Sequence, residues 1–446
     1  MPQSSRSEHF KWLKPIGCSN PGTVTKNVSV SMFSVKTRLN VNYLVLHLTA
    51  VLKLSLQLLR KIDFSLGRYF MFKFRFVAIP LTGLSILAIG ANVFAQSGSV
   101  LKFVVGSSSF VSPLIELYGD VSVGEKSFIA SNTVLNAQPG TKICIGNETN
   151  LQDNINFIAL PDTPAPASPC SAKSSSTQNK VSIAHQATIR NSRIGNFTFI
   201  GFRSQIINST LEDGAFVLHG AMVANVTIPK NRIVPIGAKI TTQAQANALK
   251  PKAEANSKFQ NEVLEVNAEF AEHYNELYRE KGYSGVSGVS AAPKTSWNPK
   301  PVAPTLGKNV RLENFARIVG DVRIGDDSEV GERTSIRADE GSPIIIGNNA
   351  KIEDRVTFHA LKGTSIKIGN NLDTDDNIVF HGPLEVGNNL TIKDDVVLFR
   401  SKVGNNVTIG TGAIVVGVTL RDRTFVPDKA LITTQAQADK LQRVRR

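Results

Sequence analysis

A stretch of the sequence, residues 331–383, combines an apolar background with side chains that could do chemistry. The polar residues that stand out in it are Arg337, Asp339, Glu340, His359 and His381. Imidazole and carboxylate groups are the side chains that most often transfer protons or bind metals in proteins. His359 directly follows an apolar residue of the background pattern. A polar side chain at this place in the repeat therefore requires an explanation. This stretch is therefore where we expect a functional site.

The apolar background repeats every six residues. Its members are Ile324, Val330 and Ile336, then Ile346, Ile352 and Phe358, then Val386, Ile392 and Leu398, and finally Val403, Ile409 and Val415. A helix would need spacings of three and four, and an ordinary strand would alternate by two. A sustained period of six with β-branched residues predicts a left-handed parallel β-helix of hexapeptide repeats. Each coil buries its apolar row only against its neighbours, so stability grows by stacking.

The same repeat occurs twice along the chain, over residues 104–250 and 308–446. A loop from Pro161 to Lys180 interrupts the first copy, and both copies end in the same run, Ile-Thr-Thr-Gln-Ala-Gln-Ala, starting at Ile240 and Ile432. The predicted fold class is all-β with accessory helices, in which two hexapeptide-repeat β-helices stand in tandem.

The segment between the two copies is predicted to be a helix followed by a linker. Residues 251–282 include apolar side chains at helical spacing from Asn256 to Lys281, and either Asn256 or Ser257 suits the N-cap. Residues 283–307 are rich in Gly, Ser and Pro, which predicts a flexible linker.

The N-terminal part differs in composition from the rest. Residues 1–75 hold twelve Lys and Arg against Glu8 and Asp63, and so carry most of the formal charge of +14. The repeat domains keep only about +4, so we expect no nucleic-acid partner. Residues 71–95 contain a short basic region, an apolar run and small residues around Ala95, which is typical of a secretory signal peptide.

A signal peptide at this place makes residues 1–70 an extension of the gene model or a basic tail. The alternative is a membrane anchor that includes the apolar run from Tyr43 to Leu59. Both readings place the repeat domains across a membrane, and a bacterial periplasm is the expected compartment. Cys144 and Cys170 form an even pair in such an exported protein, so a disulfide between them is an open alternative to two free thiols.

The polar residues of the two copies do not coincide when the copies are compared. Where the second copy has Arg337, Asp339, Glu340, His359 and His381, the first has Asn136, Gln138, Pro139, Ile158 and Arg190. Conversely, the first copy has Asn150, Gln152 and His185 where the second has Lys351, Glu353 and Asp376. Each copy thus holds the half of a site that the other lacks.

On these motifs, both copies resemble the γ-class carbonic anhydrases over nearly all of residues 104–442. The second copy carries RADEG, HAL, HGP and SKVGNN in family order, and the first carries NLQD, SIAHQ and ITTQAQA. The resemblance implies prisms that pack in threes, with a metal at the interface between neighbours. It implies His359 and His381 as two ligands from one prism and His185 as the third from the other.

The resemblance also implies the chemistry. Three neutral imidazoles would leave a divalent metal, zinc with iron or cobalt as alternatives, open to water. Hydroxide on the metal would attack CO₂ and give bicarbonate. Gln152 and Asn267 would orient hydroxide and CO₂ with support from Asn150, and Glu340 would contact the bound water or pass protons. Arg337 and Asp339 would pair across the interface.

One position departs from the family pattern. The carboxylate that carries protons in the best-known branch corresponds to Lys362, which is a poor proton carrier. Turnover is therefore expected to be slow or to depend on buffer.

Other readings of the same residues stay open. The histidines could be structural, as we expect for His219 and His273, and the residues Arg337, Asp339 and Glu340 could be an interface salt-bridge set. The chain could be a non-enzymatic assembly protein that kept the prism, or a hexapeptide-repeat acyltransferase with one catalytic histidine. Since a tandem supplies only two prisms, a homo-oligomer or another β-helix subunit is the expected partner, besides CO₂ and bicarbonate.

Overall fold

The computed structural model describes residues 25–27, 102–161 and 174–443 of the 446-residue chain. These residues form two β-helices in tandem, joined by the long helix α4 (Glu254–Lys281). The predicted signal peptide or anchor and Cys170 lie outside the described residues. Within the described ranges, no helix is long and apolar enough to cross a membrane.

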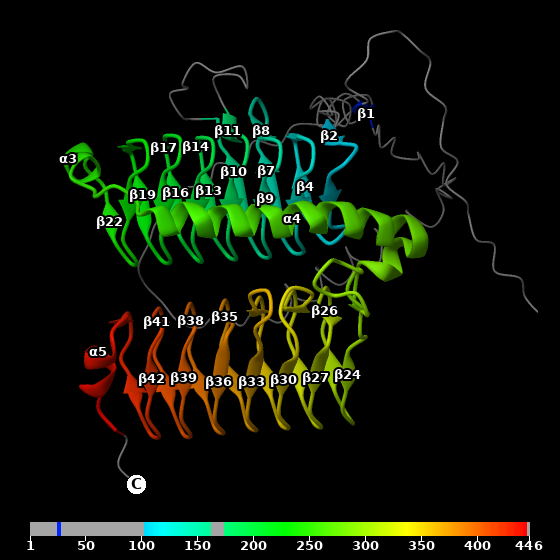
Figure 1. Cartoon of the computed structure of the whole chain (residues 1–446), viewed down its shortest axis with the longest axis vertical. Helices are drawn as coiled ribbons and strands as arrows, with labels where there is room; N and C mark the ends of the chain where they lie inside the picture. The colour runs from blue at the N-terminus through cyan, green and yellow to red at the C-terminus, as the bar shows by residue number, and fades with distance from the viewer. Residues whose placement is uncertain (1–24, 28–101, 162–173, 444–446) are drawn as a thin grey trace, which may run out of the picture. The chain divides into compact units, whose positions relative to one another are not determined.

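The first β-helix has three sheets whose consecutive coils pair in parallel (Figure 1). The sheet under α4 consists of β3 (Phe110–Val111), β6 (Phe128–Ile129), β9 (Asn150–Leu151), β12 (Ser182–Ile183), β15 (Phe199–Ile200), β18 (Phe216–Val217) and β21 (Ile233–Val234). A second sheet runs from β4 (Glu116–Tyr118) to β22 (Lys239–Ile240), and the third runs from β2 (Phe103–Gly106) to β20 (Thr227–Ile228). A short strand, β1 (Thr25–Asn27), pairs antiparallel with β2.

The second β-helix repeats this architecture. One of its sheets contains β23 (Val289–Ser290), β26 (Arg317–Gly320), β29 (Ser335–Ala338), β32 (Thr357–His359), β35 (Val379–His381), β38 (Val397–Phe399), β41 (Ile414–Val416) and β44 (Leu431–Ile432). The other two run from β24 (Thr305–Leu306) to β42 (Thr419–Leu420) and from β25 (Arg311–Leu312) to β43 (Phe425–Val426). The predicted fold class, two tandem left-handed parallel β-helices, is confirmed.

The hexapeptide period explains why these residues form such coils. Every residue of the predicted apolar row in the second copy is buried, and Phe358 stacks on Phe380 of the next coil with ring centroids 4.4 Å apart. The corners between sheets need a left-handed backbone, which Asn and Asp adopt more readily than most residues. Asn132, Asn154 and Asn377 occupy such corners, with φ near +60° in each. Each coil thus combines buried aliphatic residues in its strands with residues at its corners that tolerate a left-handed backbone.

The repeated Thr-Thr-Gln-Ala-Gln-Ala run closes both β-helices in the same way. It forms the short helices α3 (Gln243–Asn247) and α5 (Gln435–Asp439). Thr242 and Thr434 are the N-caps, and each forms a capping box with the Gln three residues later. The two copies therefore end at equivalent points.

Helix α4 runs along one face of the first β-helix, across its strands (Figure 1). Phe270 and Tyr274 of α4 pack against Phe110 and Phe128, with Phe110 and Tyr274 ring centroids 5.1 Å apart. The helix begins earlier than predicted, and its N-cap is Ala253 rather than Asn256 or Ser257. That prediction was wrong because Asn256 serves at the third helical position instead, where its Oδ1 accepts the N–H of Ala253.

The predicted flexible linker makes defined contacts. It contains a 3₁₀ turn, η1 (Gly282–Gly285), and strand β23, which pairs with β26. Arg317 donates hydrogen bonds to the carbonyl groups of Ser287 and Gly288, and Trp297 Nε1 donates to the carbonyl group of Asp339. These contacts could not be read from the composition, because the partner groups lie in the second β-helix. The interrupting loop also returns to the fold, since β11 (Ser174–Thr177) pairs with neighbouring coils.

The two β-helices contact each other along one row of corner residues. Gln186 Nε2 donates to the carbonyl groups of Arg355 and Ile378, and Arg203 Nη2 forms an ion pair with Asp395. An apolar cluster shared by both domains lies beside this row: Ala184, Phe199, Phe202 and Phe216 from the first and Val379, Val397 and Phe399 from the second. The surfaces that meet are different on the two sides, so this is a heterologous interface.

Candidate metal centre

Four side chains of the second β-helix form one column along its interface sheet. Arg337, His359, His381 and Phe399 occupy consecutive strands β29, β32, β35 and β38, and each is the direct cross-strand partner of the next. Neighbouring positions in a parallel sheet point to the same face. The parallel register therefore brings together residues that are 22 and 18 positions apart in the sequence, and it points all four side chains toward the first β-helix.

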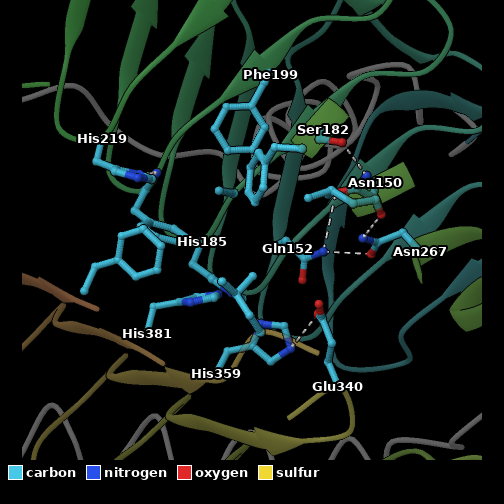
Figure 2. A pocket seen from close by; sticks show the side chains of 16 residues that line it. Asn150, Gln152, Ser182, His185, Phe199, His219, Asn267, Glu340, His359 and His381 are labelled. Carbon is cyan, nitrogen blue, oxygen red and sulfur yellow. Dashed lines mark hydrogen bonds and ion pairs between the residues drawn. The ribbon is translucent and has the colours of Figure 1, made fainter. Parts of the chain in front are cut away.

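His185 completes the cluster from the first β-helix. It lies in the corner after β12, and its Nε2 is 3.1 Å from Nδ1 of His359. Ligand atoms of His185, His359 and His381 all lie within 4.8 Å of one another, and all three side chains are buried (Figure 2). The structure thus brings together the three residues that the sequence singled out as ligands, from two domains and three strands or corners.

The other nitrogen of each imidazole faces an oxygen atom. Nδ1 of His185 lies 3.3 Å from Asp153 Oδ2, and Nε2 of His359 lies 3.4 Å from Asp339 Oδ1. Nδ1 of His381 lies 3.3 Å from the carbonyl oxygen of Gly382. Histidines that bind metals usually turn their second nitrogen toward such an oxygen, which fixes the tautomer. Nε2 of His185, Nδ1 of His359 and Nε2 of His381 are left for a metal.

This donor set fits a divalent metal ion. Burial lowers the pKa of His185 to about 4, and it also lowers the pKa of His381 well below the usual range. Both rings are therefore neutral near pH 7, the form that binds metals. Zinc–nitrogen distances of about 2.0–2.1 Å in a tetrahedron separate ligand nitrogens by about 3.3 Å. The 3.1 Å between the His185 and His359 nitrogens is close to that separation.

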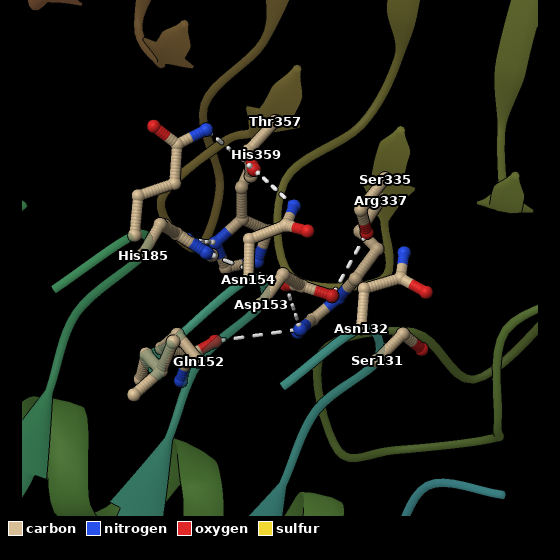
Figure 3. A network of polar contacts seen from close by, with 12 residues as sticks. Ser131, Asn132, Gln152, Asp153, Asn154, His185, Ser335, Arg337, Thr357 and His359 are labelled. Atoms are coloured by element: carbon tan, nitrogen blue, oxygen red, sulfur yellow. Dashed lines mark hydrogen bonds and ion pairs between the residues drawn. The ribbon is translucent and has the colours of Figure 1, made fainter. Parts of the chain in front are cut away.

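A buried ionic network surrounds the histidines (Figure 3). Arg337 Nη1 donates to Asp153 Oδ2 at 2.7 Å across the domain interface, and Arg337 Nε donates to Asp339 Oδ2 at 3.0 Å. Tyr274 of α4 also donates to Asp339 Oδ2, at 2.5 Å. Arg337 therefore pairs across the interface as the resemblance implied. The partners of Asp339 are Arg337, two residues earlier in the same β-helix, and Tyr274 of α4.

The charges in this network support one another. Burial alone would raise the pKa values of Asp153 and Asp339, but the guanidinium of Arg337 outweighs it and holds both well below their usual range. The two carboxylates in turn outweigh the burial of Arg337 and raise its pKa. All three groups are ionised at any physiological pH. The two carboxylates and one guanidinium therefore leave a net charge of −1 beside the imidazoles, which favours a cation between them.

Three amide side chains line the same cavity. Gln152 Nε2 donates to Asn267 Oδ1 of α4 at 2.8 Å, and Gln152 Oε1 accepts from Arg337 Nη1 at 3.3 Å. Asn150 Nδ2 donates to Ser182 Oγ at 2.8 Å. The structure brings all three residues to the cavity that the histidines line, and α4 supplies Asn267 from its buried side.

The cavity itself is small, with a volume of about 50 Å³. Since about 10 to 15 Å³ of such volume holds one water molecule, it suits only small molecules. A larger hollow of about 430 Å³ adjoins it, and both are lined by Phe259, Val263, Glu340 and Leu361. The larger hollow is therefore the approach to the histidines.

Glu340 lies where the two hollows meet. Its Oε2 is 3.4 Å from His359 Nε2, and its Oε1 accepts the backbone N–H of Lys362 at 3.1 Å. Burial raises the pKa of Glu340 above the usual carboxyl value. The Lys362 ammonium lies over the ring of Trp297, 4.7 Å from its centroid. A carboxyl group thus stands at the inner side of the approach and a lysine at the outer side.

Several residues at the site escaped the sequence comparison. Asp153 was missed because the second copy also has an aspartate there, Asp354, and a comparison of copies detects only differences. Tyr274 was one of the apolar side chains at helical spacing, and Phe202 was not singled out. The NLQD motif was the one signal that could have drawn attention to Asp153. His219 lines the cavity, whereas His273 lies apart and contacts Glu276.

The sequence is similar to those of several known proteins. A carbonic anhydrase of Methanosarcina thermophila is 34% identical over 177 residues, which cover 35% of this chain and 72% of that protein. The carboxysome assembly protein CcmM of a Nostoc species is 34% identical over 172 residues, which cover 38% of this chain and 31% of that protein. The mitochondrial gamma carbonic anhydrase 2 of Arabidopsis thaliana is 31% identical over 148 residues, which cover 33% of this chain and 48% of that protein. The chain thus spans about a third of the Nostoc protein's length. No protein-family profile matches the chain.

Proposed function

Because this chain belongs to the γ-class carbonic anhydrase family, we propose that it is a metal-dependent enzyme that converts CO₂ reversibly to bicarbonate. The observation that carries the proposal is the meeting of His185, His359 and His381 at one buried point. A single chain supplies all three ligands, so one interface of the tandem would be active. At an interface with the roles of the two copies exchanged, the three ligand positions would hold Ile158, Arg190 and Asp376. These residues bind no metal as a set.

The residues around the histidines have separable tasks in this proposal. A divalent metal bound there would supply Lewis acidity that lowers the pKa of a water molecule to about 7. The hydrogen-bonded amides of Gln152 and Asn267 would orient CO₂, since their bond to each other fixes both groups. The aromatic rings of Phe199 and Phe259 would exclude bulk water from the cavity. Glu340 would accept a proton at Oε2 and pass it toward the larger hollow.

Glu340→Gln tests this assignment. We expect the turnover number for CO₂ hydration to fall about 100-fold or more, because positioned acid–base groups contribute roughly that much. The metal content should stay at the parent level, since Glu340 is not among the clustered ligands. Stopped-flow hydration with a pH indicator measures the rate. A variant as fast as the parent would show that Glu340 carries no proton.

Lys362 gives a second kinetic prediction. A protonated lysine has no lone pair for a proton, so protons should leave the site mainly to dissolved buffer. The parent's turnover at saturating CO₂ is expected to rise severalfold between low and high imidazole concentrations. Lys362→Glu should remove most of that dependence and leave kcat/KM unchanged, and Lys362→Ala serves as its control. If the parent's turnover does not depend on the buffer concentration, another group carries the proton.

Export is part of the proposal. Residues 71–95 would direct the chain across a membrane, most simply into a bacterial periplasm, and cleavage after Ala95 would leave Gln96 as the first residue. Cys144 on strand β8 (Lys142–Ile145) is disulfide-bonded, and disulfides persist in oxidising compartments. Pairing with Cys170 stays a prediction.

An assembly role is the second candidate, and one observation favours it. The Nostoc protein that shares 34% identity is named a carboxysome assembly protein. Under this alternative the tandem would bind other proteins, either further copies or another β-helix subunit, and the histidines would be remnants. Metal content separates the two candidates, because an assembly protein has no need of a bound metal. An acyltransferase with one histidine base would give no reason for three converging imidazoles.

A further inference from the structure

His381 lies against an aromatic pair, Phe202 and His219, that the other β-helix contributes. The ring of Phe202 packs on the ring of His381, with centroids 4.7 Å apart and planes 29° apart. His219 also packs on the ring of Phe202, with centroids 4.4 Å apart and planes only 11° apart. Phe202 and His219 belong to the first β-helix and His381 to the second. The stack therefore crosses the domain interface at the candidate metal centre.

The polar surroundings of His381 differ from those of the other two histidines. His185 and His359 each face a carboxylate at 3.3 to 3.4 Å, namely Asp153 and Asp339. Among the described residues, the polar partner of the His381 ring is only the carbonyl oxygen of Gly382, at 3.3 Å. One long hydrogen bond leaves a ring free to tilt. The orientation of His381 must therefore come mainly from packing.

The rings around His381 can supply that orientation. Phe399 and His359 meet it edge-on from the adjacent strands, with centroids 5.2 Å away and planes 90° and 89° apart. Phe202 covers its face. Aromatic pairs in such stacked and edge-on geometries contribute about 0.5–1.5 kcal/mol beyond burial. Contacts with Phe399 and His359 at its edges and with Phe202 on its face are enough to hold the His381 ring in one orientation.

His219 holds Phe202 in place. Nδ1 of His219 accepts the backbone N–H of Phe202 at 3.1 Å, so the same residue contacts both the backbone and the ring of Phe202. Burial first, and the charge of Arg400 second, lower the pKa of His219 to about 3. The ring is thus neutral near pH 7. His219 therefore packs against Phe202 without adding a positive charge near a metal.

The second β-helix shows what the same positions look like without a site. The residues equivalent to Phe202 and His219 precede its corner residues with positive φ, and they are Asp394 and Thr411. They lie on the side of the tandem where Asp376 replaces His185. The aromatic pair therefore occurs only on the side that carries the three histidines.

We propose that His219, acting through Phe202, is a positioning residue that sets the ring of His381 for metal binding. The role rests on the proposed metal site and adds to it a contribution from residues that touch no metal. His219 is not one of the three clustered ligand residues, and its stacked contact is with Phe202.

A Co²⁺ titration of the full-length chain tests this role, with visible absorption as the readout of ligand geometry. His219→Ala should weaken Co²⁺ binding about 10- to 100-fold and change the spectrum, as loss of an outer-shell partner does. His219→Phe should bind within about threefold of the parent, because it keeps the stacked ring while losing the same hydrogen bond as His219→Ala. His273→Ala is the matched control at a partly exposed helix position.

The outcomes separate this proposal from the metal site itself. Equal losses in His219→Ala and His219→Phe would assign the effect to the Phe202 hydrogen bond and overturn the role of the stack. Parent-like binding and spectrum in His219→Ala would overturn it as well. A parent that binds no Co²⁺ would overturn the metal site and this role together. Thermal melts of the metal-free proteins show whether each variant is folded.

Discussion

Alanine in place of either His185 or His359 is expected to reduce the metal content from about one ion per chain to none. A catalytic site of this kind has three protein ligands, so removal of one leaves only two and opens the cluster to water. The two residues come from different β-helices, and their Nε2 and Nδ1 atoms lie 3.1 Å apart. An equal loss in both variants would therefore place the metal between the domains rather than within one of them.

Elemental analysis of protein purified under reducing, metal-supplemented conditions measures this content. His273→Ala, which removes a partly exposed histidine paired with Glu276, should keep the full complement. If the parent protein contains no metal under these conditions, the enzyme proposal falls and the tandem is better described as an assembly protein. If only one of the two variants loses metal, the site does not span the interface.

Arg337→Ala is expected to destabilise the protein by about 3 to 5 kcal/mol, the usual effect of removing one partner from a buried ion pair. Arg337 is 3% exposed, and it donates to Asp153 at 2.7 Å and to Asp339 at 3.0 Å. Without it, two buried carboxylates lose the charge that compensates them. The first and second β-helices would both be affected, because Asp153 belongs to one and Asp339 to the other.

Urea unfolding followed by circular dichroism measures this loss. Arg421→Ala removes an arginine from an ion pair with Asp439 that is about half exposed, so its effect should stay below about 1 kcal/mol. Adding Asp153→Asn to Arg337→Ala should recover part of the stability, since one of the stranded charges is then gone. A loss under 1 kcal/mol in Arg337→Ala would mean that water reaches the network and screens it.

The repeat architecture was accessible from the sequence because its cause is local. A residue buried every sixth position needs no knowledge of distant partners, so the apolar row from Ile324 to Val415 predicted the coils directly. The duplicated Thr-Thr-Gln-Ala-Gln-Ala run likewise predicted two copies, because a capping box is made within four residues. The N-cap of α4 was missed, because Ala253 has no capping side chain and Asn256 accepts the backbone N–H of Ala253 from the third helical position.

The candidate ligands were accessible because the two copies of one repeat differ there. His185 stands opposite Asp376, and His359 stands opposite Ile158, so each copy reveals what the other lost. Asp153 gave no such contrast, because its counterpart Asp354 is also an aspartate. Resemblance in motif order then supplied the roles of the amides and of Glu340.

How residues from the two β-helices meet could be seen only in the folded molecule. The coils and the duplication follow from spacing within the sequence, and the three histidines were predicted from the contrast between the copies and from the family resemblance. The pairing of Arg337 with Asp153, the bond from Tyr274 to Asp339 and the stack on His381 join residues 65 to 184 positions apart. Such contacts depend on how one prism sits against another. That placement comes from packing summed over the whole interface, which no local pattern encodes.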